Sequence, residues 1–181
     1  MGGAMVTPNN PAHLSSGAAT GVGLGLLVVA WAVYDLLWKS PLGKNEMVAG
    51  SISFVLTVGV AYGLSTVMAG RAAYIHVGAM YGTLMAGNVW MRIWPAQRKI
   101  IKATKEGTTP EAGAGPIAKL RSKHNTYMSM PLIAIMISNH FPTTTYGAQY
   151  GWQVLALIVL VGWAAVKFCY VKGASEAPTR Y

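Results

Sequence analysis

The sequence predicts an all-α fold, a polytopic membrane bundle of about five transmembrane helices, and three observations support this fold class. Of the 181 residues, 53% are hydrophobic and 10% are charged, whereas a soluble domain carries about 25% charged residues. The apolar residues form successive stretches that, as helices, approach the roughly 20 residues needed to cross a bilayer. The cations gather at the ends of these stretches, which indicates contact with a lipid bilayer and no binding of nucleic acid.

Each apolar stretch is expected to form one helix of a single transmembrane domain that covers residues 17–172. The expected helices occupy about residues 17–38, 47–68, 72–93, 126–141 and 148–170. A Pro-, Asn- and Gly-rich tail over residues 1–16 is expected to be irregular and periplasmic, and residues 173–181 are expected to form a cytoplasmic tail. The basic and then Gly/Pro-rich segment 96–123 is expected to form a mobile cytoplasmic loop.

The basic residues predict the orientation of these helices. All 14 Lys and Arg residues except Arg71 lie at or after the ends of the first, third and fifth expected helices. Cytoplasmic loops are enriched in Lys and Arg, so this side of the bundle is expected to be cytoplasmic. The amino terminus is then periplasmic and the carboxyl terminus cytoplasmic.

The third expected helix carries polar side chains inside its apolar run. In a membrane such groups face a partner helix, a cavity or a cofactor. Successive steps of about 100° place five residues on one stripe of this helix, namely His76, Met80, Thr83, Gly87 and Trp90. A histidine with Met80 beneath it and free space at Gly87 suits a flat porphyrin lying against the helix. The alternative is a buried histidine that bonds a neighbouring side chain or a backbone carbonyl.

A second histidine is expected at the same membrane level. The third helix descends from the outer face and the fourth ascends to it, so His140 arrives at the depth of His76. Two imidazoles could ligate one metal ion or the iron of a b-type haem. His124 lies about 24 Å from His140 at 1.5 Å per residue and cannot share that site. The candidate metal ligands are therefore His76 and His140, and Met80, Gly87 and Asn139 complete the candidate cofactor-binding set.

Other polar residues are expected to have structural partners. Asp35 is expected to pair with Lys39, which lies four residues on and therefore on the same helix face. Asn125, Ser129 and Asn139 are expected to form interhelical hydrogen bonds. A proton-relay role for Asp35 is the alternative.

Three long segments resemble one known family. They are VYDLLWKSPLGKN (33–45), AGRAAYIHVGAMYGTLMAGNVWMRIWPAQRKII (69–101) and RSKHNTYMSMPLIAIMISNHFP (121–142). They resemble the later half of the urate oxidase amino-terminal domain, the membrane domain of cytochrome c-linked urate hydroxylases. The resemblance implies a multi-helix redox module of the bacterial inner membrane that passes electrons to a c-type cytochrome. The positions that match the family's pattern are His76, Asn88, Trp94, Pro95, Arg121, Asn125, Asn139 and His140.

Family members usually carry further membrane helices and often a cytochrome c domain. The resemblance therefore implies that other membrane subunits and a c-type cytochrome act together with this chain, which is not expected to be catalytic alone. The leading hypothesis is a subunit of a respiratory-type redox complex that holds haem b near the periplasmic face. The alternatives are a non-redox accessory subunit that packs through small-residue ridges such as Gly59-x-x-x-Gly63, and, third, a small-solute transporter.

Overall fold

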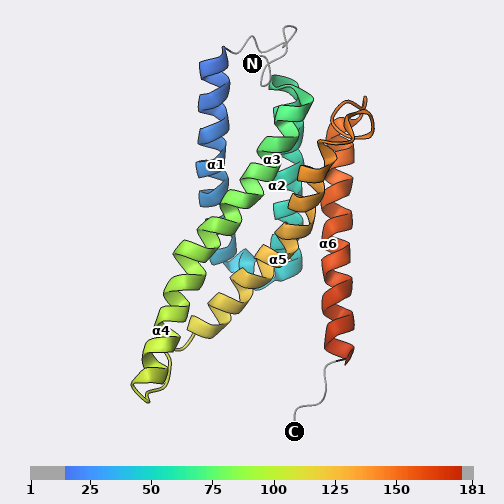
Figure 1. The fold of residues 1–181 in the computed structure, drawn as a ribbon. Helices are drawn as coiled ribbons and strands as arrows, with labels where there is room; N and C mark the ends of the chain where they lie inside the picture. Colours follow the sequence, from blue (N-terminus) through green and yellow to red (C-terminus); the bar gives the residue numbers. More distant parts are fainter. Residues whose placement is uncertain (1–14, 177–181) are drawn as a thin grey trace.

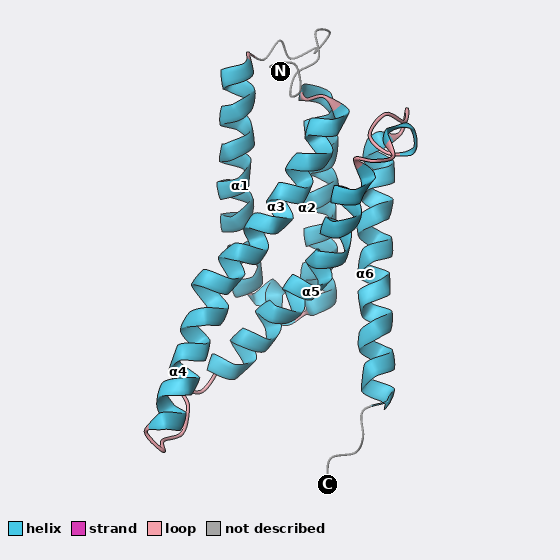
Figure 2. Ribbon diagram, viewed as in Figure 1, coloured by secondary structure: helices cyan, strands magenta, loops and turns pink. Residues whose placement is uncertain are grey.

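The computed structural model describes residues 15–176, and over that range it consists of helices and turns (Figures 1 and 2). The helices are α1 (Ser16–Lys39), α2 (Glu46–Val67), α3 (Gly70–Asn88), α4 (Trp94–Lys105), α5 (Ala114–Ser138) and α6 (Gly151–Glu176). Short 3-10 turns occupy Pro41–Lys44 and Pro142–Thr144, and a π-helical turn over Val89–Ile93 joins α3 to α4. The all-α prediction is confirmed. Most of the two expected tails lies outside the described residues.

Polar capping residues define where the first two helices begin. The Ser15 hydroxyl accepts a hydrogen bond from the Ala18 amide at 3.2 Å. The Asn45 side chain accepts from the amides of Met47 and Val48 at 3.1 and 3.3 Å. Such caps satisfy amides that have no partner inside the helix. The expected ranges 17–38 and 47–68 coincide with α1 and α2 to within one residue at each end.

Helices α1, α2, α3, α5 and α6 run alternately up and down, and α4 continues in the direction of α3 (Figure 1). Helices α3 and α5 lie at the centre. Helix α3 packs against α1, α2 and α5, and α5 packs against α3, α4 and α6. Helix α1 packs chiefly against α3 and only slightly against α2. The ends of α1 and α6 and the hairpin between α4 and α5 lie at one end of the bundle (Figure 1). Almost all of the basic residues therefore gather at that end.

Three helices are long and apolar enough to cross a membrane. They span Gly17–Lys39, Glu46–Val67 and Gly151–Gly173, in α1, α2 and α6. Many of their large apolar side chains are exposed, such as Val28 on α1, Val55 on α2 and Val161 on α6. Lipid contact would cover these faces. The central helices α3 and α5 carry more polar side chains and are shielded by their neighbours, so five crossings remain a prediction.

The prediction that residues 96–123 form a loop is wrong, because most of the segment is helical. That segment forms a helical hairpin of α4 and the first turns of α5, joined by residues 106–113. Small side chains hold the hairpin together, because Ala96 and Ala103 of α4 and Ala114 and Ala118 of α5 are buried. Helix α5 therefore begins well before the expected start at residue 126 and ends at Ser138. The helices continue past the apolar stretch because amphipathic helices can pack on each other outside a membrane.

The helical rod also continues through Pro95, where a helix would normally break. Proline lacks an amide proton, and its ring clashes with the carbonyl four residues earlier. The π-helical turn over Val89–Ile93 lies immediately before it and widens the backbone there. In this turn the Trp94 amide donates to the Val89 carbonyl, five residues back. The expected helix 72–93 is therefore part of a longer rod that ends at Lys105.

Pro131 lies inside α5 and sets how closely α6 approaches. It is fully buried, and a Cβ at Gly162 of α6 would lie 2.8 Å from its Cδ. Real Cβ atoms do not come this close, so glycine permits the contact. By contrast, Gly59 on α2 has no atom of another element within 4 Å of its Cβ position.

The Gly162→Ala substitution should destabilise the bundle, whereas Gly59→Ala should not. Overpacking costs about 1–3 kcal/mol, and both substitutions gain up to about 1 kcal/mol of helix propensity. The comparison therefore isolates the contact between α5 and α6. The stability of both variants is measured by unfolding with SDS or heat in detergent micelles. Equal stabilities of the two variants would contradict close packing at Gly162.

Candidate functional site

His76 faces α1 rather than a cofactor-sized space. Its imidazole is half-buried, and Nδ1 lies 3.3 Å from the Ala72 carbonyl of its own helix. A Cβ at Gly23 of α1 would overlap Nε2 of His76. Both ring nitrogens therefore face protein, which matches the alternative of a packed histidine bonded to a backbone carbonyl.

The space expected at Gly87 is filled. A Cβ there would overlap the indole of Trp31, which packs against this part of α3 from α1. Met80 is buried in the apolar core. Helical periodicity predicted which residues share the stripe but not which helix packs on it, and α1 covers the face on which a porphyrin was expected.

His140 and Asn139 lie in the turn after α5. His140 is exposed, and the Asn139 side chain donates to the Met136 carbonyl at 3.1 Å. Within residues 15–176, no hydrogen bond or ring contact joins His140 to His76, and no group of three or more His, Cys, Asp or Glu side chains could hold a metal ion. The packing around these predicted ligands does not fit a haem held between them.

A charge cluster forms instead where α1, the π-helical turn and α5 meet. The Asp35 carboxylate on α1 is almost completely buried. It accepts from Lys39 at 2.9 Å, as predicted, and from Arg121 of α5 at 3.0 Å. Arg92 in the π-helical turn donates through Nε at 2.8 Å and also through Nη2. One carboxylate thus meets three cations, and Arg121 also lies over the Tyr34 ring, 5.0 Å from its centroid.

A chain of hydrogen bonds leads away from this cluster. The Met85 carbonyl can only accept, and it accepts from the Asn125 amide nitrogen at 3.2 Å. The Asn125 carbonyl oxygen therefore faces Asn88, whose amide nitrogen donates to it at 2.9 Å and to the Tyr34 hydroxyl at 2.8 Å. The Tyr34 hydroxyl lies 2.7 Å from Nδ1 of His124. We assign the Tyr34 proton to this bond, because the opposite direction would leave both that buried proton and Nε2 of His124 without a partner. The backbone carbonyl of Met85 thus orients both amides of the chain.

The same assignment gives the tautomer of His124. A neutral imidazole carries one proton, and because Nδ1 accepts, that proton lies on Nε2. Within the described residues, Nε2 of His124 is buried and has no hydrogen-bond partner. The imidazole is 8% exposed, and the Trp38 ring lies against it with centroids 3.9 Å apart.

Three of the positions that matched the family pattern meet in this site: Asn88, Arg121 and Asn125. Sequence reasoning set His124 aside and missed Tyr34. The depth argument applied to the two histidines would have paired Asn88 with Asn125, because one helix descends and the other ascends. The prediction of interhelical bonding is confirmed for Asn125. It is wrong for Ser129 and Asn139, because their side chains donate to backbone carbonyls of α5, those of Thr126 and Met136.

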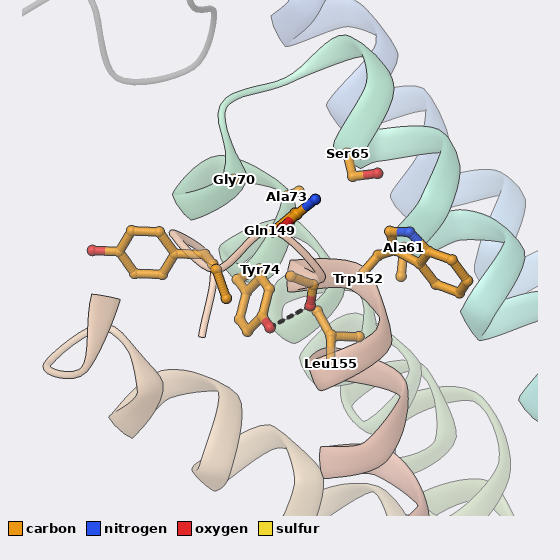
Figure 3. A pocket seen from close by; sticks show the side chains of 11 residues that line it. Ala61, Ser65, Gly70, Ala73, Tyr74, Gln149, Trp152 and Leu155 are labelled. Atoms are coloured by element: carbon orange, nitrogen blue, oxygen red, sulfur yellow. Dashed lines mark hydrogen bonds between the residues drawn. The ribbon is translucent and has the colours of Figure 1, made fainter. Parts of the chain in front are cut away.

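A small polar cavity of about 270 Å³ lies at the opposite end of the bundle (Figure 3). Its walls come from the end of α2, the start of α3 and the start of α6. The Tyr74 hydroxyl donates to the Gly151 carbonyl at 2.6 Å and closes one side, as the dashed line in Figure 3 shows. The contact holds the start of α6 against α3.

The Asp35→Asn substitution should strongly destabilise the protein. It would leave the buried Arg121 and the partly buried Arg92 without a counter-ion, and breaking such a pair costs about 3–5 kcal/mol. The matched control is Glu46→Gln, because the pair of Glu46 with Lys123 is much more exposed and should contribute at most about 1 kcal/mol. Unfolding in detergent micelles measures the stability of both variants. If Asp35→Asn lost no more stability than Glu46→Gln, the central role of the cluster would be contradicted.

Comparison with known proteins gives one finding. A family model described as urate oxidase N-terminal matches residues 2–180. Neither the curated proteins nor the solved structures give a match. Because the match covers nearly the whole sequence, the resemblance is confirmed, and this chain belongs to the urate oxidase N-terminal family.

Proposed function

We propose that this protein is an integral membrane subunit of a redox complex that exchanges electrons with a c-type cytochrome on another chain. The observation that carries the proposal is the family match over residues 2–180. Three apolar helices support a place in the bilayer. The buried polar site supports a functional role, because ionisable side chains inside a membrane protein are costly to bury and usually serve its activity.

The charge distribution supports a defined orientation in the cytoplasmic membrane of a bacterium. The basic α4–α5 hairpin and the carboxyl-terminal end of α6 lie at one end of the bundle (Figure 1). Under the positive-inside rule this end is cytoplasmic. A c-type cytochrome would then approach the opposite, periplasmic end, where α2, α3 and α6 enclose the small cavity of Figure 3.

No step of this proposal depends on a haem between His76 and His140, because their surroundings do not fit one. The haem b prediction still has a direct test. Reduced-minus-oxidised and pyridine haemochrome spectra of the purified complex would be compared for wild type, His76→Ala and His140→Ala. The packing predicts the same b-type signal in all three proteins. Loss of that signal in both variants would contradict this prediction and restore the bis-histidine site.

The proposed function is tested by electron transfer in the isolated membrane complex. Membranes that lack the chain should lose reduction of the c-type cytochrome, with urate as the first electron donor to try, and the wild-type chain should restore it. The Tyr34→Phe variant removes one hydroxyl from the buried site. It should lower the rate several-fold at an unchanged yield of complex.

An accessory role is the second candidate function. The exposed apolar faces of α1, α2 and α6 favour it, because partner helices could cover them. An accessory chain would be needed for assembly, but Tyr34→Phe would then leave the electron-transfer rate of the assembled complex unchanged. Cytochrome reduction at the wild-type rate without the chain would overturn both roles.

A further inference from the structure

A large cleft opens between α1 and α2, the two helices that barely touch. Its volume is about 820 Å³, and all the long helices except α4 contribute to its walls. The wall is mostly apolar, with residues such as Leu26, Val60 and Leu84. Ligand sites of this kind are apolar clefts of about 300–1,000 Å³ with a few polar groups that fix orientation.

Three residues of the cleft wall carry buried hydrogen-bond donors without acceptors. Trp38, His124 and Trp163 all line it. Within residues 15–176, the buried ring nitrogens Nε1 of both tryptophans and Nε2 of His124 have no hydrogen-bond partner. An indole nitrogen can only donate, and the assigned tautomer of His124 makes its Nε2 a donor as well. A buried donor without a partner costs about 1–3 kcal/mol, so a ligand with acceptor atoms would remove an existing penalty.

The surroundings favour a flat, neutral ligand. Aromatic rings line the cleft. Trp38 packs against His124 with ring centroids 3.9 Å apart. Phe54 packs against Trp163 with ring centroids 5.9 Å apart. At the rim of the cleft, Lys123 is neutralised by Glu46 at 2.5 Å, and this hydrogen bond raises the pKa of Lys123. Lys167 also lines the cleft but is exposed, so the preference for a neutral ligand rests on the buried donors, which suit carbonyl oxygens.

We propose that this cleft binds a membrane-soluble quinone, a flat ring with two carbonyl acceptors and an apolar tail. One carbonyl accepts from Nε2 of His124, the other accepts from Nε1 of Trp163, and the tail lies along the apolar wall towards Val60. The head group reaches His124 by displacing the Trp38 ring, which is half-buried and lines the same cleft. The choice of a quinone rests on the proposed redox function, but the test below measures binding alone.

Decylubiquinone would be titrated into the purified chain in nanodiscs of zwitterionic phospholipid, with tryptophan fluorescence as the readout. The wild-type chain should show saturable quenching. The His124→Phe variant keeps a ring but loses the donor, which should raise the apparent Kd about 3- to 10-fold. The matched control is His140→Phe, which alters an exposed histidine outside the cleft and should leave the Kd unchanged.

Trp163→Phe provides a second variant, in case His124→Phe fails to fold by circular dichroism. It removes another donor and keeps an aromatic ring, and its Kd should also rise. Quenching that is linear in quinone, or an equal Kd in both cleft variants and the control, would overturn the proposal. A third outcome would also overturn the proposal: phosphatidylglycerol competes with the quinone, and Lys167→Gln abolishes this competition. Because Lys167 lines the cleft, the cleft would then hold an anionic lipid. If the quinone does not bind but the c-type cytochrome is still reduced, only the quinone site is refuted. If the quinone binds but the cytochrome is not reduced, only the proposed function is refuted.

Discussion

The burial of the Asp35 carboxylate is the constraint on which the rest of the structure depends. One carboxylate draws together Lys39 of α1, Arg92 of the π-helical turn and Arg121 of α5. Taking charges out of water costs several kcal/mol per ion, and only close, well-oriented partners compensate for that cost. The three elements therefore cannot separate without leaving charge buried and unpaired. This requirement fixes the crossing of α1, α3 and α5.

The polar and apolar helices have a clear division of roles. Helices α1, α2 and α6 present apolar faces outward. Helices α3 and α5 keep Asn88, Arg121 and His124 buried between them and their neighbours. Small residues allow this arrangement, because Gly23 and Gly87 admit the rings of His76 and Trp31 between α1 and α3. Close helix contacts of this kind are typical of membrane bundles, in which lipid supplies no hydrophobic force between helices.

The apolar runs predicted the helical fold, but they did not predict the site. Helices α1 and α2 were predictable because apolar segments end at Ser, Asn and Pro residues with known capping behaviour. The α4–α5 hairpin was missed because its small alanine interface carries little apolar signal. The predicted stripe through His76 was sound geometry, but a stripe does not reveal which helix covers it. The Asp35–Lys39 pair is local and was found, whereas Arg92 and Arg121 join it only through tertiary packing.

The hydrogen-bond chain from Met85 to His124 has one further consequence, which concerns protons. A proton wire must be able to reverse the direction of all its bonds after each transfer. This chain ends on a backbone carbonyl, which can only accept a hydrogen bond and cannot become a donor. Its polarity is therefore permanent, and protons cannot pass along it. The Asn125, Asn88 and Tyr34 side chains act as a rigid mount that holds one imidazole proton pointing in one direction.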